Sequence, residues 1–140
     1  MTTEFTSSVI NTRHRLLGGL LLLVAFSAVA FADCGEALTQ REMNSCFADR
    51  AAQSDRALEA AVLTYQQMLD ATQRVEFGQV QAQWQKFRDA DCAFTASGVS
   101  GGSIAPTVIA TCLETHNHDR LRDLEQLLHC SEGDISCPAW

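Results

Sequence analysis

The chain has 140 residues, with 10 basic and 17 acidic side chains and a formal charge of −7. This length suits one domain of ordinary small size. The acidic balance argues against nucleic acid and anionic membrane surfaces as partners and favours a basic one.

The first predicted element is a secretory signal peptide over residues 1–32. Arg13 and Arg15 precede the apolar run LLGGLLLLVAFSAVAFA, which ends in a small-x-small pattern at Ala32. An uncleaved membrane anchor is the alternative, but the run is short against the roughly 20 residues that a spanning helix needs. We therefore predict cleavage before Asp33 and a periplasmic or secreted product with no membrane association.

The mature chain is predicted to be a single domain over residues 33–140, free of a lipid anchor. Asp33 stands directly before Cys34, where a lipoprotein signal places a small residue. Removal of Glu4, Arg13 and Arg15 makes the net charge one unit more negative, which strengthens the preference for a basic partner.

Three segments carry helical periodicity, and none alternates with period two for long. A capping box at Thr39 and Glu42 starts the first, whose apolar spacing runs to about residue 72. The third begins near Pro106, which suits the first turn of a helix. We predict an all-α fold, a small antiparallel bundle of about three helices. The apolar stripe of the second segment is Phe77, Val80, Trp84, Phe87, Asp91 and Phe94, and that of the third is Ile109, Cys112, Leu113, His116, Arg120, Leu121, Leu124, Leu127 and Leu128.

All six cysteines lie beyond the export signal, where an even number indicates disulfides. Antiparallel packing of the second and third helices brings the cysteines on either side of the glycine-rich reversal together. The segment after the first cysteine is long enough to run back along the first helix to the second. The last two close a short loop around a glycine. The predicted pairs are Cys34 with Cys46, Cys92 with Cys112, and Cys130 with Cys137.

A metal site has one candidate cluster, but we predict no metal or other cofactor. Glu114 and His118 are four residues apart and can share a helix face, and histidine with carboxylate suits zinc. However, two ligands at this spacing are common by chance, and no recognised zinc signature is present. Neighbouring candidates are His116, Asp119 and His129.

Catalytic residues are not predicted either, so we do not expect an enzyme. Asp89 and Asp91 point about 200° apart on a helix and cannot flank one bond. Asp89 is expected at the surface, and Arg88 is a candidate ion-pair partner for Asp91. The sequence has no serine nucleophile elbow, phosphate loop or dinucleotide fingerprint.

The loop from Ser97 to Pro106 is the candidate partner-binding site. Glycine-rich loops on a rigid scaffold often carry binding contacts, and the disulfide expected at its base lowers the ordering cost of binding. The alternative is a simple chain reversal that needs small residues. The candidate residues are Gly98, Ser100, Gly101, Gly102 and Ser103.

The cysteine spacing and several blocks together resemble the LprI-type lysozyme inhibitor family of secreted bacterial proteins. These blocks are LTQREMNSC, AQWQKFRDADCAF, SGGSIAP and CSEGDISCP. The likeness runs from about Cys34 to Pro138, and one departure is Asn117, where the family often has threonine. The residues that match the motif are Cys34, Cys46, Trp84, Arg88, Asp89, Cys92, Gly101, Gly102, Ser103, Pro106, Cys112 and Arg120.

The resemblance implies a small helical envelope protein that binds lysozyme and blocks cell-wall hydrolysis. Lysozymes are commonly basic, which agrees with the acidic composition. An envelope adaptor or structural interaction module without effect on lysozyme is the alternative. In both readings Trp84, Phe87, Arg88, Asp89 and Arg120 form a structural motif that holds the helices together.

Overall fold

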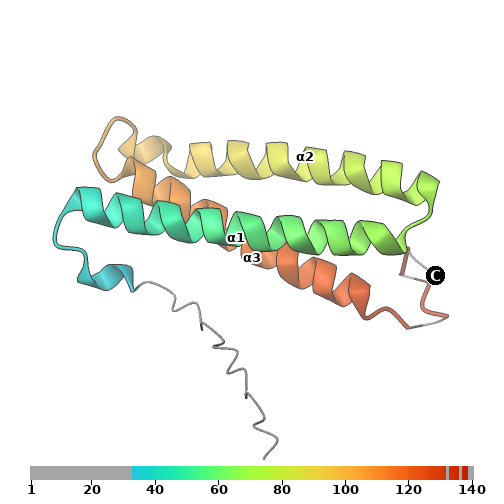
Figure 1. Cartoon of the computed structure of the whole chain (residues 1–140). Coiled ribbons are helices and arrows are strands. Elements are labelled where there is room, and N and C mark those ends of the chain that lie inside the picture. The colour runs from blue at the N-terminus through green and yellow to red at the C-terminus, as the bar shows by residue number, and fades with distance from the viewer. Residues whose placement is uncertain (1–32, 132, 136, 139–140) are drawn as a thin grey trace, which may run out of the picture.

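Three long helices and two short 3-10 turns form the described part of the chain. In order these are η1 (Cys34–Glu36), α1 (Gln40–Met68), α2 (Ala71–Thr95), η2 (Ser97–Val99) and α3 (Ala105–Leu128) (Figure 1). The computed structural model describes residues 33–131, 133–135 and 137–138, and the predicted signal peptide lies outside them. Since these residues contain no strand, the predicted all-α fold is confirmed.

Capping boxes begin both α1 and α2. The predicted box starts α1, because Glu42 N donates to Thr39 Oγ1 at 3.2 Å and Thr39 N donates to Glu42 Oε2 at 2.9 Å. A second box, missed from the sequence, starts α2. Gln73 N donates to Asp70 Oδ1 at 2.8 Å, and Asp70 N donates to Gln73 Oε1 at 3.1 Å. This box ends α1 at Met68 rather than near residue 72.

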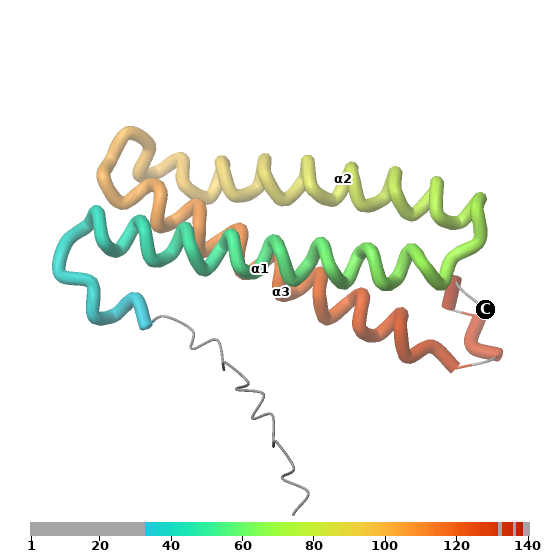
Figure 2. Tube along the Cα trace, in the orientation of Figure 1, coloured from blue at the N-terminus to red at the C-terminus, as the bar shows by residue number. Residues whose placement is uncertain are grey.

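Consecutive helices run antiparallel, so α1 and α3 run in the same direction (Figure 2). The axis of α3 crosses α1, and these two helices form the most extensive helix contact in the described chain. The main apolar cluster lies toward the α1–α2 connection and comprises Leu58, Tyr65, Leu69 and Leu124. Burial of these side chains is the main apolar contribution to stability.

The buried face of α2 differs from the apolar stripe in its sequence. Val80, Phe87 and Phe94 are 55%, 58% and 77% exposed, whereas Gln81 is buried. The side chain of Arg88 is only 12% exposed. The helix is therefore rotated so that polar side chains face α1 and α3, and three large apolar side chains face solvent.

A group of polar side chains, Ser54, Asp55, Arg88 and Asn117, joins all three helices, and we call it the polar junction. Asn117 of α3 is fully buried, and its Oδ1 accepts from Arg88 Nη1 of α2 at 2.7 Å. Its Nδ2 donates to Ser54 Oγ and Asp55 Oδ1 of α1, both at 2.9 Å. Arg88 Nη1 also donates to Asp55 Oδ1 at 2.8 Å. This junction ties α2 to the α1–α3 pair in the middle of the bundle.

The ion pair expected between Arg88 and Asp91 does not form. Arg88 pairs with Asp55 and with its neighbour Asp89, whose side chain is 62% exposed as expected of a surface residue. Asp91 instead pairs with His116 Nε2 at 2.9 Å. Arg88 points toward Asn117, so Asp91 in the next turn of α2 is free to pair with His116 of α3.

All three predicted disulfides are present. Cys34–Cys46 ties η1 to α1, Cys92–Cys112 joins the end of α2 to the start of α3, and Cys130–Cys137 closes the C-terminal tail. Cross-links of this kind stabilise a small domain chiefly by restricting its unfolded chain, although that account is disputed.

Candidate functional site

The predicted binding loop lies at the end of the bundle where α1 begins, α2 ends and α3 begins (Figure 1). We call this surface the loop end and define it by Leu38, Phe94 and residues 97–104. Every predicted loop residue is exposed: Gly98, Ser100, Gly101, Gly102 and Ser103.

Backbone hydrogen bonds give the loop a defined shape. Val99 N donates to Ala96 O, Gly102 N to Val99 O, and Ala105 N to Gly102 O, at 2.9 to 3.1 Å. Such consecutive turns satisfy backbone groups that an open loop would leave to water. The loop is therefore a built structure between two helices.

Side chains of α1 and α3 hold the far side of the loop. Asn44 Nδ2 donates to Ser103 O at 2.9 Å, and Thr107 Oγ1 donates to Asn44 Oδ1 at 2.6 Å. Gln40 Nε2 donates to both Asn44 Oδ1 and Thr107 Oγ1. With Cys92–Cys112 at its base, the loop is fixed at both sides, which lowers the entropy lost on binding a partner.

The backbone favours glycine at one loop position, leaves little room for a side chain at a second, and has open space at a third. Gly101 has φ of 76°, a conformation that side chains with a Cβ disfavour. A Cβ on Gly102 would lie 3.0 Å from Val99 O, whereas a Cβ on Gly98 would meet nothing within 4 Å. The sequence could not distinguish these three positions.

Large apolar side chains surround the loop. Leu38 is 93% exposed ahead of α1, Phe94 is 77% exposed in the last turn of α2, and Ile104 is 41% exposed before α3. Exposed apolar side chains gathered near polar groups are typical of protein-binding surfaces. These three residues were not among the candidate binding residues predicted from the sequence, because they are separated along the chain and each is a single apolar residue near a helix end.

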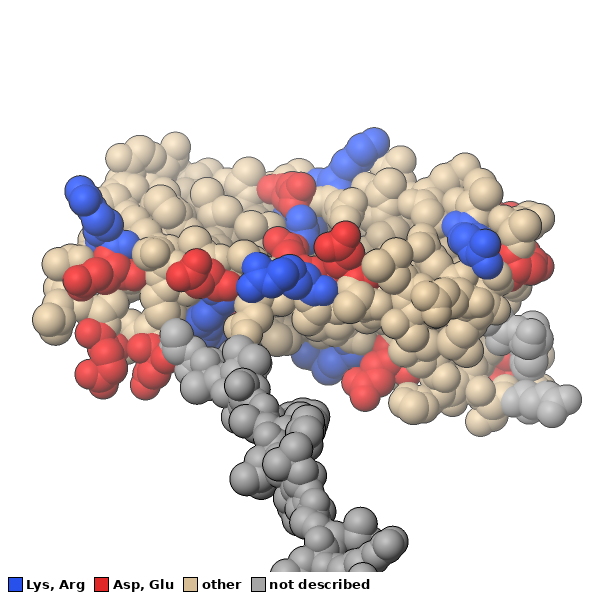
Figure 3. Space-filling model, viewed as in Figure 1, with Lys and Arg blue, Asp and Glu red and all other residues tan. Residues whose placement is uncertain are grey.

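Charge at this end is largely acidic on the side of η1. Asp33, Glu36 and Glu42 lie there, and Figure 3 shows acidic side chains beside η1, others mixed with basic ones along the bundle, and a mostly uncharged surface over the loop end of α2. A basic partner that approached the loop would meet attractive charge beside an apolar contact.

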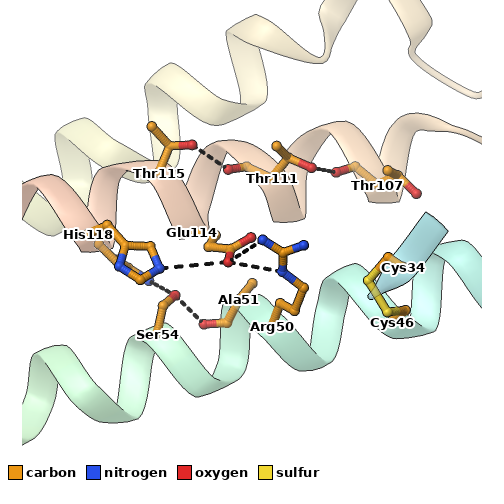
Figure 4. Close-up of polar contacts among 11 residues, drawn as sticks. Cys34, Cys46, Arg50, Ala51, Ser54, Thr107, Thr111, Glu114, Thr115 and His118 are labelled. Atoms are coloured by element: carbon orange, nitrogen blue, oxygen red, sulfur yellow. Dashed lines mark hydrogen bonds and ion pairs between the residues drawn. A yellow bond between two sulfur atoms is a disulfide. The ribbon is translucent and has the colours of Figure 1, made fainter. Parts of the chain in front are cut away.

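The histidine and carboxylate cluster considered as a metal site is part of the α1–α3 contact (Figure 4). Glu114 and His118 do share a helix face, with Oε1 and Nε2 3.7 Å apart. Glu114 Oε1 also accepts from Arg50 Nε and Nη2 at 3.1 and 2.9 Å. The carboxylate is thus engaged by an arginine, which joins α1 to α3.

One other grouping of metal-binding residue types occurs among the described residues, namely Cys92, Cys112 and His116. The two sulfur atoms form a disulfide, so they are not thiolate ligands in this structure. His116 Nε2 bonds Asp91, and its ring packs edge-on against Phe87.

The Trp84 ring connects two parts of the structural motif predicted from the sequence, because its centroid lies 5.3 Å from Arg88 Cζ and also close to Arg120. Arg88 belongs to the polar junction and pairs with Asp89. Arg120 lies with its Cζ 5.8 Å from the centroid of the Trp84 ring and 6.0 Å from that of Phe77. Phe87 is exposed, and its ring packs edge-on against His116 of α3.

Two groups near the contact of Trp84 with Arg120 have shifted pKa values. Burial lowers the pKa of Arg120, which the nearby charges of Asp123 and Tyr65 partly offset. Burial raises the pKa of Tyr65, and the Arg120 charge opposes that rise. A cation and a phenol therefore lie close together in a weakly hydrated part of the bundle.

Comparison with known proteins decides the family. Residues 32–124 match the family described as Lysozyme inhibitor LprI. The chain belongs to the LprI lysozyme inhibitor family. The match covers all three helices of the LprI fold almost to the end of α3, including the loop end.

A relative of this LprI family member is an uncharacterized protein of Rhizobium meliloti (strain 1021). It is 28% identical over 118 residues, which cover 72% of this chain and 82% of the relative. No solved structure matches the chain. Within the described residues, no helix has the length and apolar character required to cross a bilayer.

Proposed function

We propose that the protein inhibits a lysozyme by placing the loop end over the enzyme's substrate cleft. Support comes from family membership together with one observation: an exposed loop with three serines is held by Cys92–Cys112 and Asn44 and flanked by exposed apolar side chains. The loop is a short link between two helices and projects at the end of the bundle (Figure 1), which suits entry into a concave cleft. Its fixed shape keeps the entropic cost of binding small.

The electrostatic part of this proposal concerns the rate of encounter. A chain of net charge −7 attracts a basic enzyme over about a Debye length, and added salt screens that attraction. The proposed contact itself is apolar and polar rather than ionic, so salt is expected to slow association more than it speeds dissociation.

The decisive experiment is a cell-wall lysis assay with the purified mature chain and several lysozymes. We expect inhibition of at least one lysozyme and an association rate that falls about tenfold or more between low and physiological salt. Absence of inhibition for every lysozyme type would overturn the proposed function. Inhibition with a salt-independent rate would keep the target but remove the electrostatic argument.

The loop glycines supply matched variants for locating the contact. Gly101→Ala should weaken inhibition about tenfold, because the left-handed backbone conformation at this position costs alanine about 1–2 kcal/mol. Gly102→Ala places a Cβ 3.0 Å from Val99 O and should weaken inhibition to a smaller extent. Gly98→Ala should leave inhibition unchanged, since its Cβ meets open space. Equal inhibition by all three variants would place the contact on a helix face instead.

An envelope adaptor remains a second candidate because of the exposed apolar face of α2. Val80, Phe87 and Phe94 recur every seven residues and lie on one side of the helix. If this face recruits a partner, Phe87→Ser should abolish capture of a stable non-lysozyme partner from an envelope extract and leave lysozyme inhibition unchanged. Phe94→Ser, at the loop end, should weaken inhibition. A loss of inhibition in Phe87→Ser with no partner captured by the unmodified chain would contradict the adaptor reading.

A further inference from the structure

A concave feature lies at the end of the bundle opposite the loop, near the α1–α2 connection. This cavity has a volume of about 300 Å³ and lies among all three helices and the C-terminal tail. Its volume is at the lower end of the range for small-molecule sites. The apolar lining residues are Leu69, Phe77, Val80, Leu127 and Pro138, and the polar ones are Tyr65, Gln73, Glu76 and Arg120.

Arg120 brings an incompletely paired cation to the inner wall of the cavity. Its side chain is 13% exposed, and its Nε donates to Gln81 Oε1 at 3.2 Å. Its Nη1 lies 3.9 Å from Asp123 Oδ2, too far for a hydrogen bond, and that carboxylate is 62% exposed. No hydrogen bond from either Nη atom reaches another described residue. A buried guanidinium with free donors favours an anionic ligand.

Tyr65 adds a second donor without a partner. The residue is 1% exposed, and its hydroxyl oxygen is the buried side-chain polar atom in the described chain that has no hydrogen-bond partner. An unpaired buried hydroxyl costs about 1–3 kcal/mol, which makes it unusual in a native structure. Tyr65 and Arg120 both donate, so the group that this region lacks is an acceptor.

The C-terminal tail completes the cavity. Cys130–Cys137 folds the tail back, and Gln73 Nε2 donates to Pro138 O, which holds Pro138 against the start of α2. Leu69, Phe77 and Leu127 line the same cavity as Pro138 and Arg120, so apolar surface and a cation share one lining. A cavity that combines apolar surface with a cation suits an amphiphile.

We propose that this cavity binds an aliphatic monocarboxylate, with the carboxylate at Arg120 and the acyl chain along Leu69, Phe77 and Leu127. Charge complementarity favours this occupant over an alcohol or an ammonium amphiphile. The net charge of −7 opposes general attraction of anions, so any preference for the carboxylate must come from the local cation. The site is at the far end from the loop and does not depend on the proposed lysozyme contact.

The test uses the full mature chain with dodecanoate, dodecanol and dodecyltrimethylammonium, each well below its micelle concentration, in titration calorimetry. We expect one dodecanoate per chain, with binding at least about tenfold weaker for the other two probes. Absence of dodecanoate binding, or equal binding of all three, would overturn the proposal.

Two variants test the two ends of the ligand. Arg120→Lys keeps the charge but loses the planar fork, and should weaken dodecanoate binding about fivefold or more with little change for dodecanol. Leu127→Phe adds volume within the cavity and should weaken dodecanoate and dodecanol alike, whereas Leu63→Phe, at an exposed position outside the cavity, should change neither. Dodecanoate binding that is unaffected by both cavity variants would place the ligand elsewhere and refute the assignment.

Glu76 provides a test of the carboxylate position whose expected result would not follow if Arg120 had only a structural role. It is the carboxylate that lines the cavity, and it is exposed at the surface. Glu76→Gln should strengthen dodecanoate binding about twofold to fivefold by removing a like charge, and should leave dodecanol binding unchanged. Weaker dodecanoate binding in this variant would contradict the placement of the carboxylate.

Discussion

Replacing both Cys92 and Cys112 by alanine should lower the free energy of unfolding by about 3 kcal/mol and weaken lysozyme inhibition about tenfold. The disulfide has a sequence separation of 20 residues, for which restriction of the unfolded chain contributes about that energy. In a domain of this size the loss corresponds to a fall in Tm of about 10–15 °C. Denaturant unfolding and the lysis assay measure the two effects.

The expected loss of inhibition has a local cause. Cys92 lies in the last turn of α2 and Cys112 in α3, so the bond closes the segment that contains the whole loop. Without it, the end of α2 is joined to α3 only by weaker contacts such as the pair of Asp91 with His116. The loop would then lose conformational entropy when it binds lysozyme, an entropy that the disulfide now removes before binding.

The matched control is removal of the disulfide at the other end of the bundle. Replacing Cys130 and Cys137 by alanine opens a loop of sequence separation 7 and should cost about 2 kcal/mol, with inhibition unchanged at temperatures where both variants are folded. It should instead weaken dodecanoate binding, because Pro138 would no longer be held at the cavity. Equal losses of inhibition in the two double variants would show that inhibition follows global stability and would contradict a role for the loop.

Features set by local spacing could be predicted from the sequence. The Thr39–Glu42 box, the three helices and all three disulfides depend on residues a few positions apart or on the two sides of one reversal. The Asp70–Gln73 box has the same spacing and was detectable, but the apolar pattern of α1 continued across it. The predicted end of α1 was therefore wrong because the apolar pattern was given more weight than the capping box.

The orientation of α2 could not be predicted, because it depends on partners from other helices. Hydrophobic periodicity alone directs Phe87 inward and Arg88 toward solvent, yet Phe87 is 58% exposed and Arg88 is nearly buried. Burial of an arginine is tolerated only where acceptors meet it, and these come from Asp55 on α1 and Asn117 on α3. Neither partner is close to Arg88 in the sequence.

Only the loop of the candidate site could be predicted from the sequence, because the rest of the site also depends on residues from other helices. The glycine-rich loop is visible as a composition change, and its residues are exposed as expected. Its apolar rim joins Leu38, Phe94 and Ile104 from three separate helix ends, and the cavity joins Arg120 to a tail near Pro138. Both depend on tertiary assembly, which residue spacing along one helix does not encode.

Asn117→Ala should lower the free energy of unfolding by about 3 kcal/mol, as measured by denaturant unfolding. The side chain is fully buried and makes hydrogen bonds to Ser54, Asp55 and Arg88. Arginine can only donate and a carboxylate can only accept, so the amide is matched to both, with oxygen toward Arg88 and nitrogen toward Asp55. Alanine removes these bonds, one of them charge-assisted, and leaves a small void.

Two further variants distinguish this polar junction from a simple volume effect. Asn117→Thr, the residue that the family resemblance places here, keeps a hydroxyl that can accept from Arg88 but can donate only one hydrogen bond where the amide donates two, and should lose about half as much free energy as Asn117→Ala. Thr115→Ala removes the exposed bond to Thr111 O and should change stability by less than about 0.5 kcal/mol. If Asn117→Ala were as mild as Thr115→Ala, the hydrogen bonds of the polar junction would contribute little to the free energy of unfolding. The burial of Arg88 would then need another explanation, because a charged side chain is buried at a net cost unless its acceptors repay it.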